Sequence, residues 1–306
     1  MSDQRATVVV ITWNRRDEVL ATLDRLAVLP EQPPVIVVDN GSVDGTSIAV
    51  RSRHPGVRLV TLPRNEGAAA RNAGVALAAT PYVAFNDDDT WWAPGSLATA
   101  ADVLDACPRL AVLTAHIRVE PGGVDDPICA EIAASELRRP PDVPGHPLLS
   151  FLAGASMVRR SAFSAAGGFE PRLFLGGEEE LLGADLVSAG WAMTYLPEAV
   201  IHHQASVARD AEERLRLGIR NTMWSTWLRR PLPAALRRSA WMLRRFPAAP
   251  VTVRGLAAAA GGAPMVHAWR RPVPPAIDDG LRTLERQQRR STARRYRVAP
   301  GGDDRG

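Results

Sequence analysis

This sequence of 306 residues contains no lysine, so all 37 of its basic side chains are arginines. Cysteine is scarce as well: the only two, Cys107 and Cys129, are too few for a disulfide framework or a cysteine-based metal site. No run of about 18 apolar residues occurs, and the nearest approach, residues 246–266, is interrupted by Arg254 and by several prolines and glycines. We therefore expect neither a disulfide scaffold nor a membrane-spanning helix.

The N-terminal sequence leads us to expect no secretion signal. The N-terminus leads directly into the β-branched run at residues 7–12, without a charged stretch followed by an apolar one. Together with the low cysteine content, this pattern predicts a protein of the reducing cytoplasm.

Acidic residues dominate the first two-thirds of the chain, and arginines dominate the rest. Residues 1–206 hold 16 Arg against 25 Asp and Glu, a net charge of −9, whereas residues 207–306 hold 21 Arg against 8 Asp and Glu, a net charge of +13. This asymmetry predicts two regions with different partners. We expect one domain over residues 1–206, a basic helical region over 207–295 and a disordered tail over 296–306.

Short apolar runs alternate with helical patterns through the first two-thirds of the chain. The runs are typical of strands covered on both faces, and they lie at 7–12, 35–39, 57–62, 82–85, 110–115, 154–158, 193–196 and 199–202. We expect helices between them, notably at 19–27, 66–79 and 178–190, and a loop or lid over the proline- and glycine-rich residues 119–150. The predicted fold class is therefore α/β, with a mostly parallel central sheet flanked by helices.

Polar residues stand where three of the predicted strands end. Thr12 ends the first strand, Asp39 ends the second, and Asp87–Asp89 follow the fourth. Because ligands of open α/β sheets bind outside the carboxyl ends of the strands, we expect these side chains to face one ligand. Asp39 can accept hydrogen bonds from a base or a ribose, and Thr12 can bind the same ligand. The alternatives are a turn-forming Asp39 and a Thr12 that only ends its strand.

The three adjacent carboxylates at residues 87–89 repel one another, which raises their pKa values unless a counter-charge is present. A divalent cation with oxygen ligands supplies such a charge, and Mg²⁺ commonly shares its ligation with substrate phosphates. The cluster thus predicts a site for a metal ion and a phosphate. The alternative is a polar turn before a helix, with Asp89 or Thr90 as the cap.

Small residues surround Arg71 in the stretch 65–74, NEGAAARNAG. Small side chains let a helix approach a ligand closely, and the planar guanidinium of Arg71 suits a diphosphate. A solvated helix arginine is the alternative. Asn72 and Gly74 are unfavourable inside a helix, which indicates that packing or a ligand requires them.

Two further groups supply candidates for chemistry. Glu178, Glu179 and Glu180 open a predicted helix, where acidic side chains interact favourably with the helix dipole. A glutamate at a pocket wall can instead act as a general base on an attacking hydroxyl. Further along, His202 and His203 end a predicted strand, and a neutral imidazole is a common metal ligand. We expect one of the two histidines to bind the metal.

As an ordered set, these segments resemble the inverting glycosyltransferases of family 2, which have the GT-A fold. The matching stretches follow the family's order and spacing and cover about residues 6–206, roughly two-thirds of the chain. They are VVVITWNR at 8–15, VVDNGSVDGT at 37–46, NEGAAARNAG at 65–74, FNDDD at 85–89, GGF at 167–169 with the helix at 178–190, and HHQAS at 202–206.

The resemblance implies a donor that is a nucleotide-diphosphate sugar, with Asp39 near its base. The residues that would bind this donor are Thr12, Asp39, Arg71, Asp87 and Asp88. It also implies an acceptor that is a glycan or a lipid-linked molecule.

The resemblance further implies a Mg²⁺ or Mn²⁺ ion held by Asp89 and by His202 or His203. Glu179 stands where the family has its base, which is usually the Asp of a Glu-Asp pair. This chain has a glutamate there, one methylene longer, so the assignment stays open between Glu178 and Glu179.

The chemistry implied by this family is a single displacement at the anomeric carbon, which inverts its configuration. The Gln-x-x-Arg-Trp motif of processive synthases is absent, since Gln287-Gln288-Arg289-Arg290 does not match it, so we expect transfer of one sugar per encounter. A nucleotide-sugar pyrophosphorylase or a dinucleotide-dependent oxidoreductase would need a glycine-rich loop after the first strand. This chain has Trp13-Asn14-Arg15-Arg16 there. A non-catalytic nucleotide-sugar-binding module is the other alternative.

Arginine pairs and tryptophans alternate in the C-terminal region: the pairs lie at 229–230, 237–238, 244–245 and 270–271, and the tryptophans at 224, 227, 241 and 269. Such a pattern suits a membrane surface or a nucleic acid. Because the acceptors of the family are often lipid-linked, we favour an anionic membrane surface over nucleic acid and expect peripheral association at the inner face of the cell membrane. The alternative is a helical appendage whose tryptophans pack on the first domain.

Overall fold

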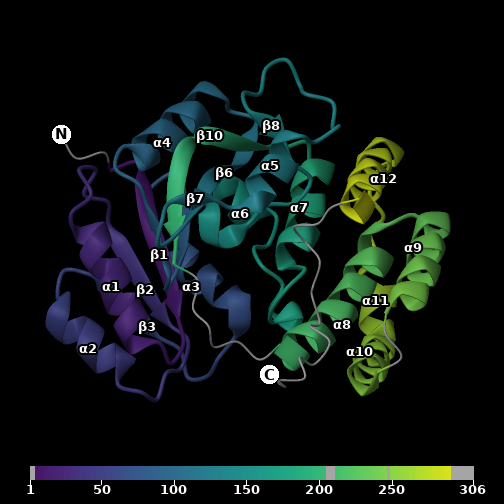
Figure 1. The fold of residues 1–306 in the computed structure, drawn as a ribbon, viewed down its shortest axis with the longest axis horizontal. Helices are drawn as coiled ribbons and strands as arrows, with labels where there is room; N and C mark the ends of the chain where they lie inside the picture. The colour runs from purple at the N-terminus through teal and green to yellow at the C-terminus, as the bar shows by residue number, and fades with distance from the viewer. Residues whose placement is uncertain (1–3, 205–210, 247–248, 291–306) are drawn as a thin grey trace, which may run out of the picture.

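One mixed β-sheet organises the computed structural model, which describes residues 4–204, 211–246 and 249–290 (Figure 1). The strands follow the order β3-β2-β1-β4-β9-β6-β10-β5, with β7 paired to β6 and β8 paired to β10. They are β1 Ala6–Thr12, β2 Val35–Asp39, β3 Arg58–Thr61, β4 Tyr82–Asp87, β5 Thr90–Trp92, β6 Leu110–Val119, β7 Val124–Asp125, β8 His146–Pro147, β9 Ser156–Arg159 and β10 Ala192–His203.

Most strands of this sheet run in one direction, as the sequence predicts. Strands β1 to β4 pair in parallel, and β6 and β10 form a second parallel pair. Strand β9 separates the two groups and is antiparallel to both β4 and β6, while β5 closes the edge antiparallel to β10. The parallel strands therefore present their carboxyl ends at the same edge of the sheet.

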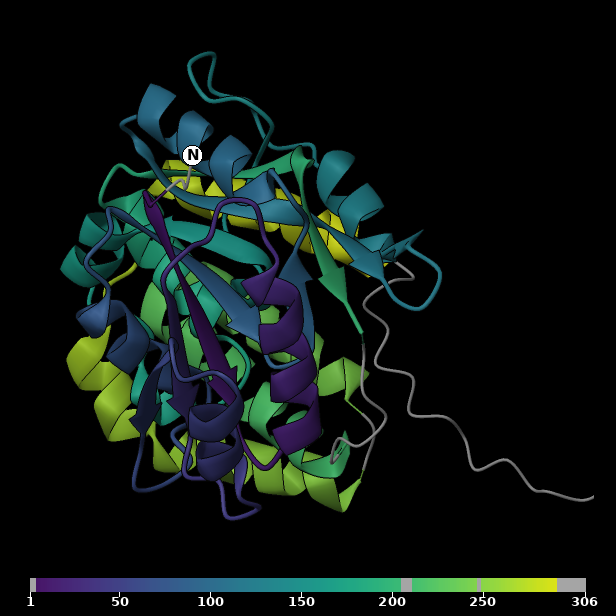
Figure 2. The ribbon, with the colours of Figure 1, turned by 90° about the vertical axis from the view of Figure 1, so that its left-hand side faces the viewer.

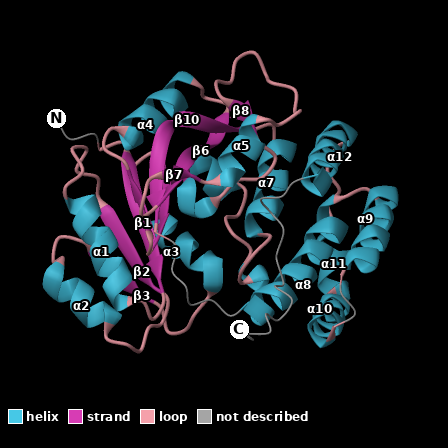
Figure 3. Cartoon of the chain, in the orientation of Figure 1, coloured by secondary structure: helices cyan, strands magenta, loops and turns pink. Residues whose placement is uncertain are grey.

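Helices cover both faces of the sheet, with α1 and α2 on one side and α7 on the other (Figures 1 and 3). The helices of this region are α1 Arg16–Ala27, α2 Thr46–Arg53, α3 Arg71–Leu77, α4 Ser96–Ala106, α5 Pro127–Ala133, α6 Arg160–Ala165 and α7 Glu178–Ser188. Short 3-10 turns occur at η1 Gly67–Ala70, η2 Ala153–Ala155 and η3 Pro171–Leu173.

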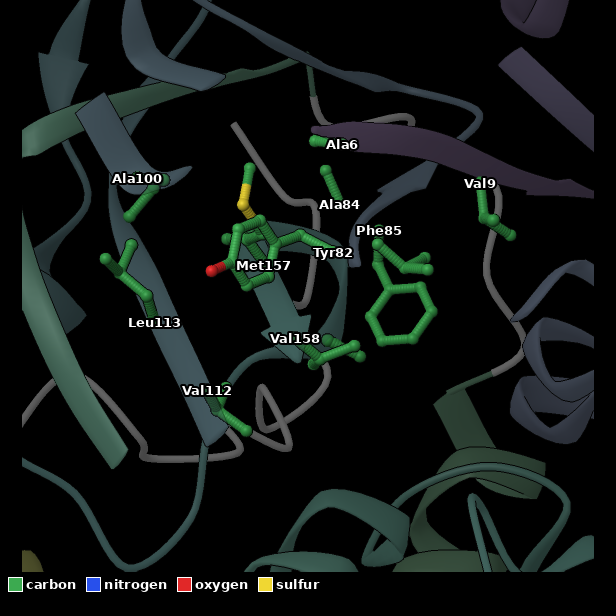
Figure 4. Close-up of a cluster of buried hydrophobic side chains, with 14 of the residues drawn as sticks. Ala6, Val9, Tyr82, Ala84, Phe85, Ala100, Val112, Leu113, Met157 and Val158 are labelled. Atoms are coloured by element: carbon green, nitrogen blue, oxygen red, sulfur yellow. The ribbon is translucent and has the colours of Figure 1, made fainter. Parts of the chain in front are cut away.

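The core lies between the central strands and the helices that cover them. Both faces of the central strands are packed there: Phe85 of β4 lies on the same side as Val158 of β9, and Met157 of β9 lies on the other side (Figure 4). All three are fully buried. Burying a side chain of this size stabilises a fold by about 1.5–3 kcal/mol, so the central strands rigidly position the residues at their ends.

Residues 119–150 are not the loop that their proline and glycine content predicts. Strand β6 continues to Val119, β7 returns against it, and α5 follows. Asp126 caps α5 by accepting a hydrogen bond from the N–H of Ile128, and Pro127 occupies the first turn. Proline is favourable at that position, where its missing N–H has no helical partner. A residue taken as a sign of a loop therefore starts a helix.

Two other elements differ from their predicted bounds. The helix expected at 66–79 begins as the 3-10 turn η1 and continues as α3 only to Leu77. The two strands expected at 193–196 and 199–202 are one strand, β10, with an irregularity in its pairing between Leu196 and Val200. Within α3, the two unfavourable residues serve packing. The side chain of Asn72 bonds the backbone of Phe169, and a side chain at Gly74 would overlap Val9 of β1.

The C-terminal helices form a group beside α7, and Figure 2 shows them behind the sheet. They are α8 Ala211–Arg229, α9 Leu232–Arg245, α10 Pro250–Gly261, α11 Ala263–Trp269 and α12 Pro275–Arg290. Trp224 of α8 packs in a buried cluster with Leu173 and Leu181 of the first region, and its indole N–H donates to the carbonyl of Ala259 at 2.9 Å. Trp224 thus packs against the first region, as one of the two alternatives for the C-terminal tryptophans predicted.

Within the described residues we find no helix with the length and hydropathy of a membrane span. The expected domain boundary near residue 207 and the expected disordered tail at 296–306 lie outside the described residues. Both stay predictions.

Gly67 joins the helix that carries Arg71 to the loop before α7. Its φ is +63°, and a side chain there would overlap the carbonyl oxygen of Phe174, which accepts from the N–H of Ala68 at 2.7 Å. We expect Gly67→Ala to lower the free energy of unfolding by about 3 kcal/mol or more, as measured by urea denaturation. Gly95 is the matched control, because it has a φ of +83° and no atom near its missing side chain. Gly95→Ala should cost only about 1–2 kcal/mol, and equal losses would contradict the packing role of Gly67.

Candidate active site

The strand ends bring three of the predicted ligand-binding residues to one edge of the sheet. In the strand register, Thr12 of β1 pairs with Asp39 of β2, and Ile11 pairs with Asp87 of β4. Thr12 and Asp39 are buried, whereas the Asp87 side chain is about one-third exposed, at 37%. The edge is thus rigid at its base and open to solvent at Asp87.

Asp39 is held by the turn that follows its strand. One carboxylate oxygen accepts from the N–H of Ser42 at 2.9 Å, and the other accepts from the hydroxyl of Ser47. Gly41 and Gly45 allow this turn, since both adopt the left-handed φ that other residues avoid. Asp39 both shapes the turn and stands at the ligand edge, so the two interpretations of the sequence do not exclude each other.

The counter-charge of the aspartate cluster is Arg15, which the sequence analysis did not single out. Its guanidinium pairs with Asp88 and donates from two nitrogens to Asp89, at 3.1 Å each. Burial raises the pKa of Asp88 to about 7, and the charges of Asp87 and Asp89 act in the same direction while Arg15 opposes them. An arginine just after β1 lies at the edge where the aspartates gather, and that position was the signal available in the sequence.

The two histidines of β10 point to different surroundings, as neighbours on a strand do. His203 Nε2 lies 3.8 Å from a carboxylate oxygen of Asp89. His202 instead bonds Glu120 at 2.8 Å through Nδ1 and stacks on Trp91, with ring centroids 5.3 Å apart. The structure therefore brings Asp89 together with His203 and leaves His202 in a separate contact.

Glu178 and Glu179 begin α7 and reach the same edge. Glu179 Oε1 accepts from the N–H of Ala153 in η2 at 3.1 Å. The next residue, Gly154, touches the Asp87 carboxylate so closely that a side chain there would lie 2.6 Å from Asp87 Oδ2. Turn η2 thus connects Glu179 to the aspartate cluster.

Both glutamates are shifted toward their protonated forms. Burial raises the pKa of Glu178 to about 8, and the Glu179 charge adds to the shift while Arg71 opposes it. Burial also raises the pKa of Glu179, against the hydrogen bond from Ala153 and the charge of Arg71. Glu178 is more deeply buried, and its Oε2 has no hydrogen-bond partner.

Arg71 lies between these groups. It is buried, ion-pairs with Asp87, and lies 6.0 Å from the ring centroids of Phe85 and Phe169. Its charge acts on both glutamates of α7. The arginine is therefore not a solvated surface residue but part of the same edge.

The C-terminal helices hold the loop that leads into α7. Asn221 of α8 donates its side-chain amide to the carbonyls of Leu173 at 2.8 Å and Leu175 at 2.9 Å, and also contacts that of Gly176. Arg220 adds a bond to the Leu173 carbonyl at 2.8 Å. Neither residue carries a signal in the sequence, because they act on backbone atoms about 45 positions away.

Divalent metal chemistry fits part of this arrangement. Within residues 4–204, 211–246 and 249–290, no group of three or more His, Cys, Asp or Glu residues is placed to enclose an ion. Asp89 and His203 nevertheless offer one carboxylate and one imidazole close together at the aspartate cluster. An oxygen and nitrogen donor pair suits Mn²⁺ or Mg²⁺ when a substrate phosphate supplies further ligands.

A mostly parallel sheet, with acidic residues at its carboxyl edge and helices on both faces, defines a GT-A glycosyltransferase. The chain belongs to glycosyl transferase family 2, whose model matches residues 7–167. The resemblance noted in the sequence is thereby confirmed.

Relatives of known activity support this membership. The chain is similar to the N-acetylglucosaminyl-diphospho-decaprenol L-rhamnosyltransferase of Mycobacterium tuberculosis, with 31% identity over 274 residues, 76% of this chain and 89% of the relative. It is also similar to the pre-mycofactocin glycosyltransferase of the same organism, with 31% identity over 184 residues, 55% of this chain and 37% of that protein.

Solved structures share the fold. The mannosyltransferase PcManGT from Pyrobaculum calidifontis, in complex with GDP-Man and Mn²⁺, has a TM-score of 0.57 and 20% identity, covering 94% of this chain and 76% of that one. S. aureus TarS residues 1–349 has a TM-score of 0.57 and 18% identity, covering 94% and 92%. These likenesses establish the GT-A fold of this chain.

The raised pKa of Glu178 predicts a pH-dependent stability. An acid with a raised folded-state pKa keeps a proton that the unfolded chain releases, so stability falls as pH rises from the ordinary value of 4.5 to about 8. We expect Glu178→Gln to stabilise the protein by about 1–2 kcal/mol at about pH 9 and to flatten this dependence. Chemical denaturation at several pH values measures it. The exposed Glu198→Gln is the control, and equal slopes for all three proteins would contradict the prediction.

Proposed function

We propose that this protein transfers one sugar from a nucleotide-diphosphate sugar to an acceptor hydroxyl, with inversion at the anomeric carbon and with a divalent metal ion. The proposal rests on one observation above all. A potential base, Glu179, and a potential metal-binding pair, Asp89 and His203, are joined to the same aspartate cluster. An inverting displacement requires these groups on opposite sides of the reacting carbon.

The donor would lie along the carboxyl edge of the sheet. Asp39, fixed by Ser42 and Ser47, is oriented to accept hydrogen bonds from the base or ribose. Thr12 pairs with it in the strand register. Arg71 suits the diphosphate, because its Nε lacks a hydrogen-bond partner although it is buried. Asp87 and Asp88 complete this binding surface.

Asp89 and His203 would hold the Mg²⁺ or Mn²⁺ ion. When bound, such an ion stabilises the negative charge that develops on the leaving nucleoside diphosphate. Arg15 ion-pairs with Asp88 and Asp89 and offsets part of their negative charge. It keeps the aspartate cluster compensated and the two carboxylates in place.

Glu179 is the preferred base. It is more exposed to solvent than Glu178, it is oriented by the N–H of Ala153, and it lies near Asp87, whose side chain is about one-third exposed. A base works best when its pKa approaches the working pH, and burial shifts Glu179 in that direction. The carboxylate would take the proton of the acceptor hydroxyl as that oxygen attacks the anomeric carbon.

The acceptor would approach through a cavity of about 340 Å³ whose lining reaches Leu152, next in sequence to the residue that bonds the base. Leu152 lines this cavity and precedes Ala153, the residue that bonds Glu179. Its walls are largely aliphatic and include Ile128, Ile132 and Leu284. An apolar approach suits a lipid-linked acceptor, such as the diphospho-decaprenol in the name of the mycobacterial relative.

We place the reaction in the cytoplasm.

Replacing each of the two glutamates in turn tests which of them is the general base. We expect Glu179→Gln to keep donor affinity and to lower kcat by about 10²–10⁴, because proton removal by a positioned base contributes that much. Glu178→Gln should retain most of the rate. Release of nucleoside diphosphate, with and without EDTA, measures both. If Glu178→Gln alone loses turnover, the base is Glu178, and if neither does, the mechanism is wrong.

Metal binding can be tested without turnover. Saturating Mn²⁺ should raise the melting temperature by a few degrees, equivalent to about 2–3 kcal/mol at a hundredfold excess over Kd. We expect the shift to disappear in Asp89→Asn and in His203→Gln. His202→Gln is the matched control, since that ring contacts Glu120 instead. A shift lost in His202→Gln but kept in His203→Gln would contradict the assignment.

A further inference from the structure

Helix α9 presents an apolar stripe to solvent. Leu232, Leu236 and Leu243 are each 54% exposed. At about 100° per residue they fall within about 40° of one another around the helix. In the described part of the chain, no other helix carries more than one large exposed apolar side chain. This stripe is therefore a concentrated feature and not the scattered exposure that every protein shows.

The inward face of α9 accounts for its attachment to the fold. Ala234, Ala235, Ser239 and Met242 are buried. Arg238 pairs with Glu180 at the start of α7 and with Glu285 of α12. Ala234 and Arg238 lie on the far side of the helix from the leucines, and Ser239 lies at the edge of the stripe. Packing among the described residues gives no reason for the exposure of the three leucines.

On one flank of the stripe lie two arginines that have no ion pair among the described residues. Arg237 and Arg244 are exposed, lie about 100–120° from the centre of the stripe, and make no ion pair within the described residues. The helix contains no Asp or Glu at all. A surface that combines an apolar stripe with an arginine border suits the interface of an anionic bilayer, where leucines enter the acyl boundary and long arginines reach the phosphates.

We propose that α9 docks this protein on an anionic lipid bilayer. A second copy of the chain fits the stripe less well, because three half-exposed leucines offer much less than the roughly 800 Å² per partner of a stable interface. A single-stranded nucleic acid would need aromatic side chains for stacking, and this stripe has none. Figure 1 shows α9 at the outer side of the C-terminal helices, away from the sheet, where a bilayer can reach it.

Docking through α9 would also orient the active site. Arg238 links α9 directly to Glu180, the residue after the proposed base. The helix that begins with Glu178 and Glu179 is thus tied to the helix that meets the lipid. The benefit for catalysis rests on the proposed lipid-linked acceptor, whereas binding to the bilayer does not.

Flotation of the full chain with vesicles tests this surface. We expect it to float with phosphatidylcholine vesicles that contain phosphatidylglycerol, less so at high salt, and not with phosphatidylcholine alone. The combined change Leu232→Glu, Leu236→Glu and Leu243→Glu should abolish binding. Arg237→Gln and Arg244→Gln should each weaken it about fivefold. Val28→Glu and Arg51→Gln, at exposed positions far from α9 in the sequence, are the controls.

Melting temperatures show whether each variant is folded, and the arginine variants test the surface even if the leucine variant is not. Absent binding to the anionic vesicles, or binding equal in the α9 variants and the controls, overturns the proposal. So does a dimer in light scattering that the leucine changes dissociate. Release of nucleoside diphosphate should be unchanged in the folded α9 variants. Loss of that activity in every protein, with vesicle binding intact, would refute the proposed function but not the docking surface.

Discussion

The crowding of negative charge at one edge of the sheet is the constraint on which this structure depends. Parallel strands deliver Asp39 and Asp87–Asp89 to the same place, and α7 adds two glutamates. Buried carboxylates are costly unless they are paired. Arg15 and Arg71 provide the pairing, while Glu178 and Asp88 respond with raised pKa values. In the function proposed above, this partly compensated edge is where a metal ion and a diphosphate donor would bind.

The C-terminal helices take part in this arrangement and are not merely attached to it. Asn221 bonds backbone carbonyls of the loop before α7, and Arg238 bonds Glu180 within the first turn of that helix. Many of the arginines that make this region basic are used internally: Arg229 pairs with Asp185, and Arg230 pairs with Asp278. Among the described arginines of this region, the positive charge left for a partner includes Arg237 and Arg244 of α9.

Local pattern was enough to predict much of the fold. The strands at 7–12, 35–39 and 82–85 were predicted because an uninterrupted apolar run has few other stable uses. The same pattern predicted that polar residues stand at the ends of these strands. The prediction of a loop over residues 119–150 was wrong, because proline is common both in loops and in the first turn of a helix, and Pro127 occupies the first turn of α5. Asn221 was missed, since nothing in its own neighbourhood shows which distant groups it contacts. Arg15 was missed although its position just after β1 places it at the carboxyl edge.

The sequence by itself determined which kinds of side chain stand at the ends of the strands and at the start of α7, because alternation of strand and helix and the period of each element are local properties. Only the tertiary structure showed which of two adjacent residues makes which contact. His203 faces Asp89 while His202 faces Glu120, and Glu179 contacts η2 while Glu178 is buried more deeply. In each pair the two side chains are of the same type and differ only in where they point. What a side chain contacts is fixed only when the other elements pack around it.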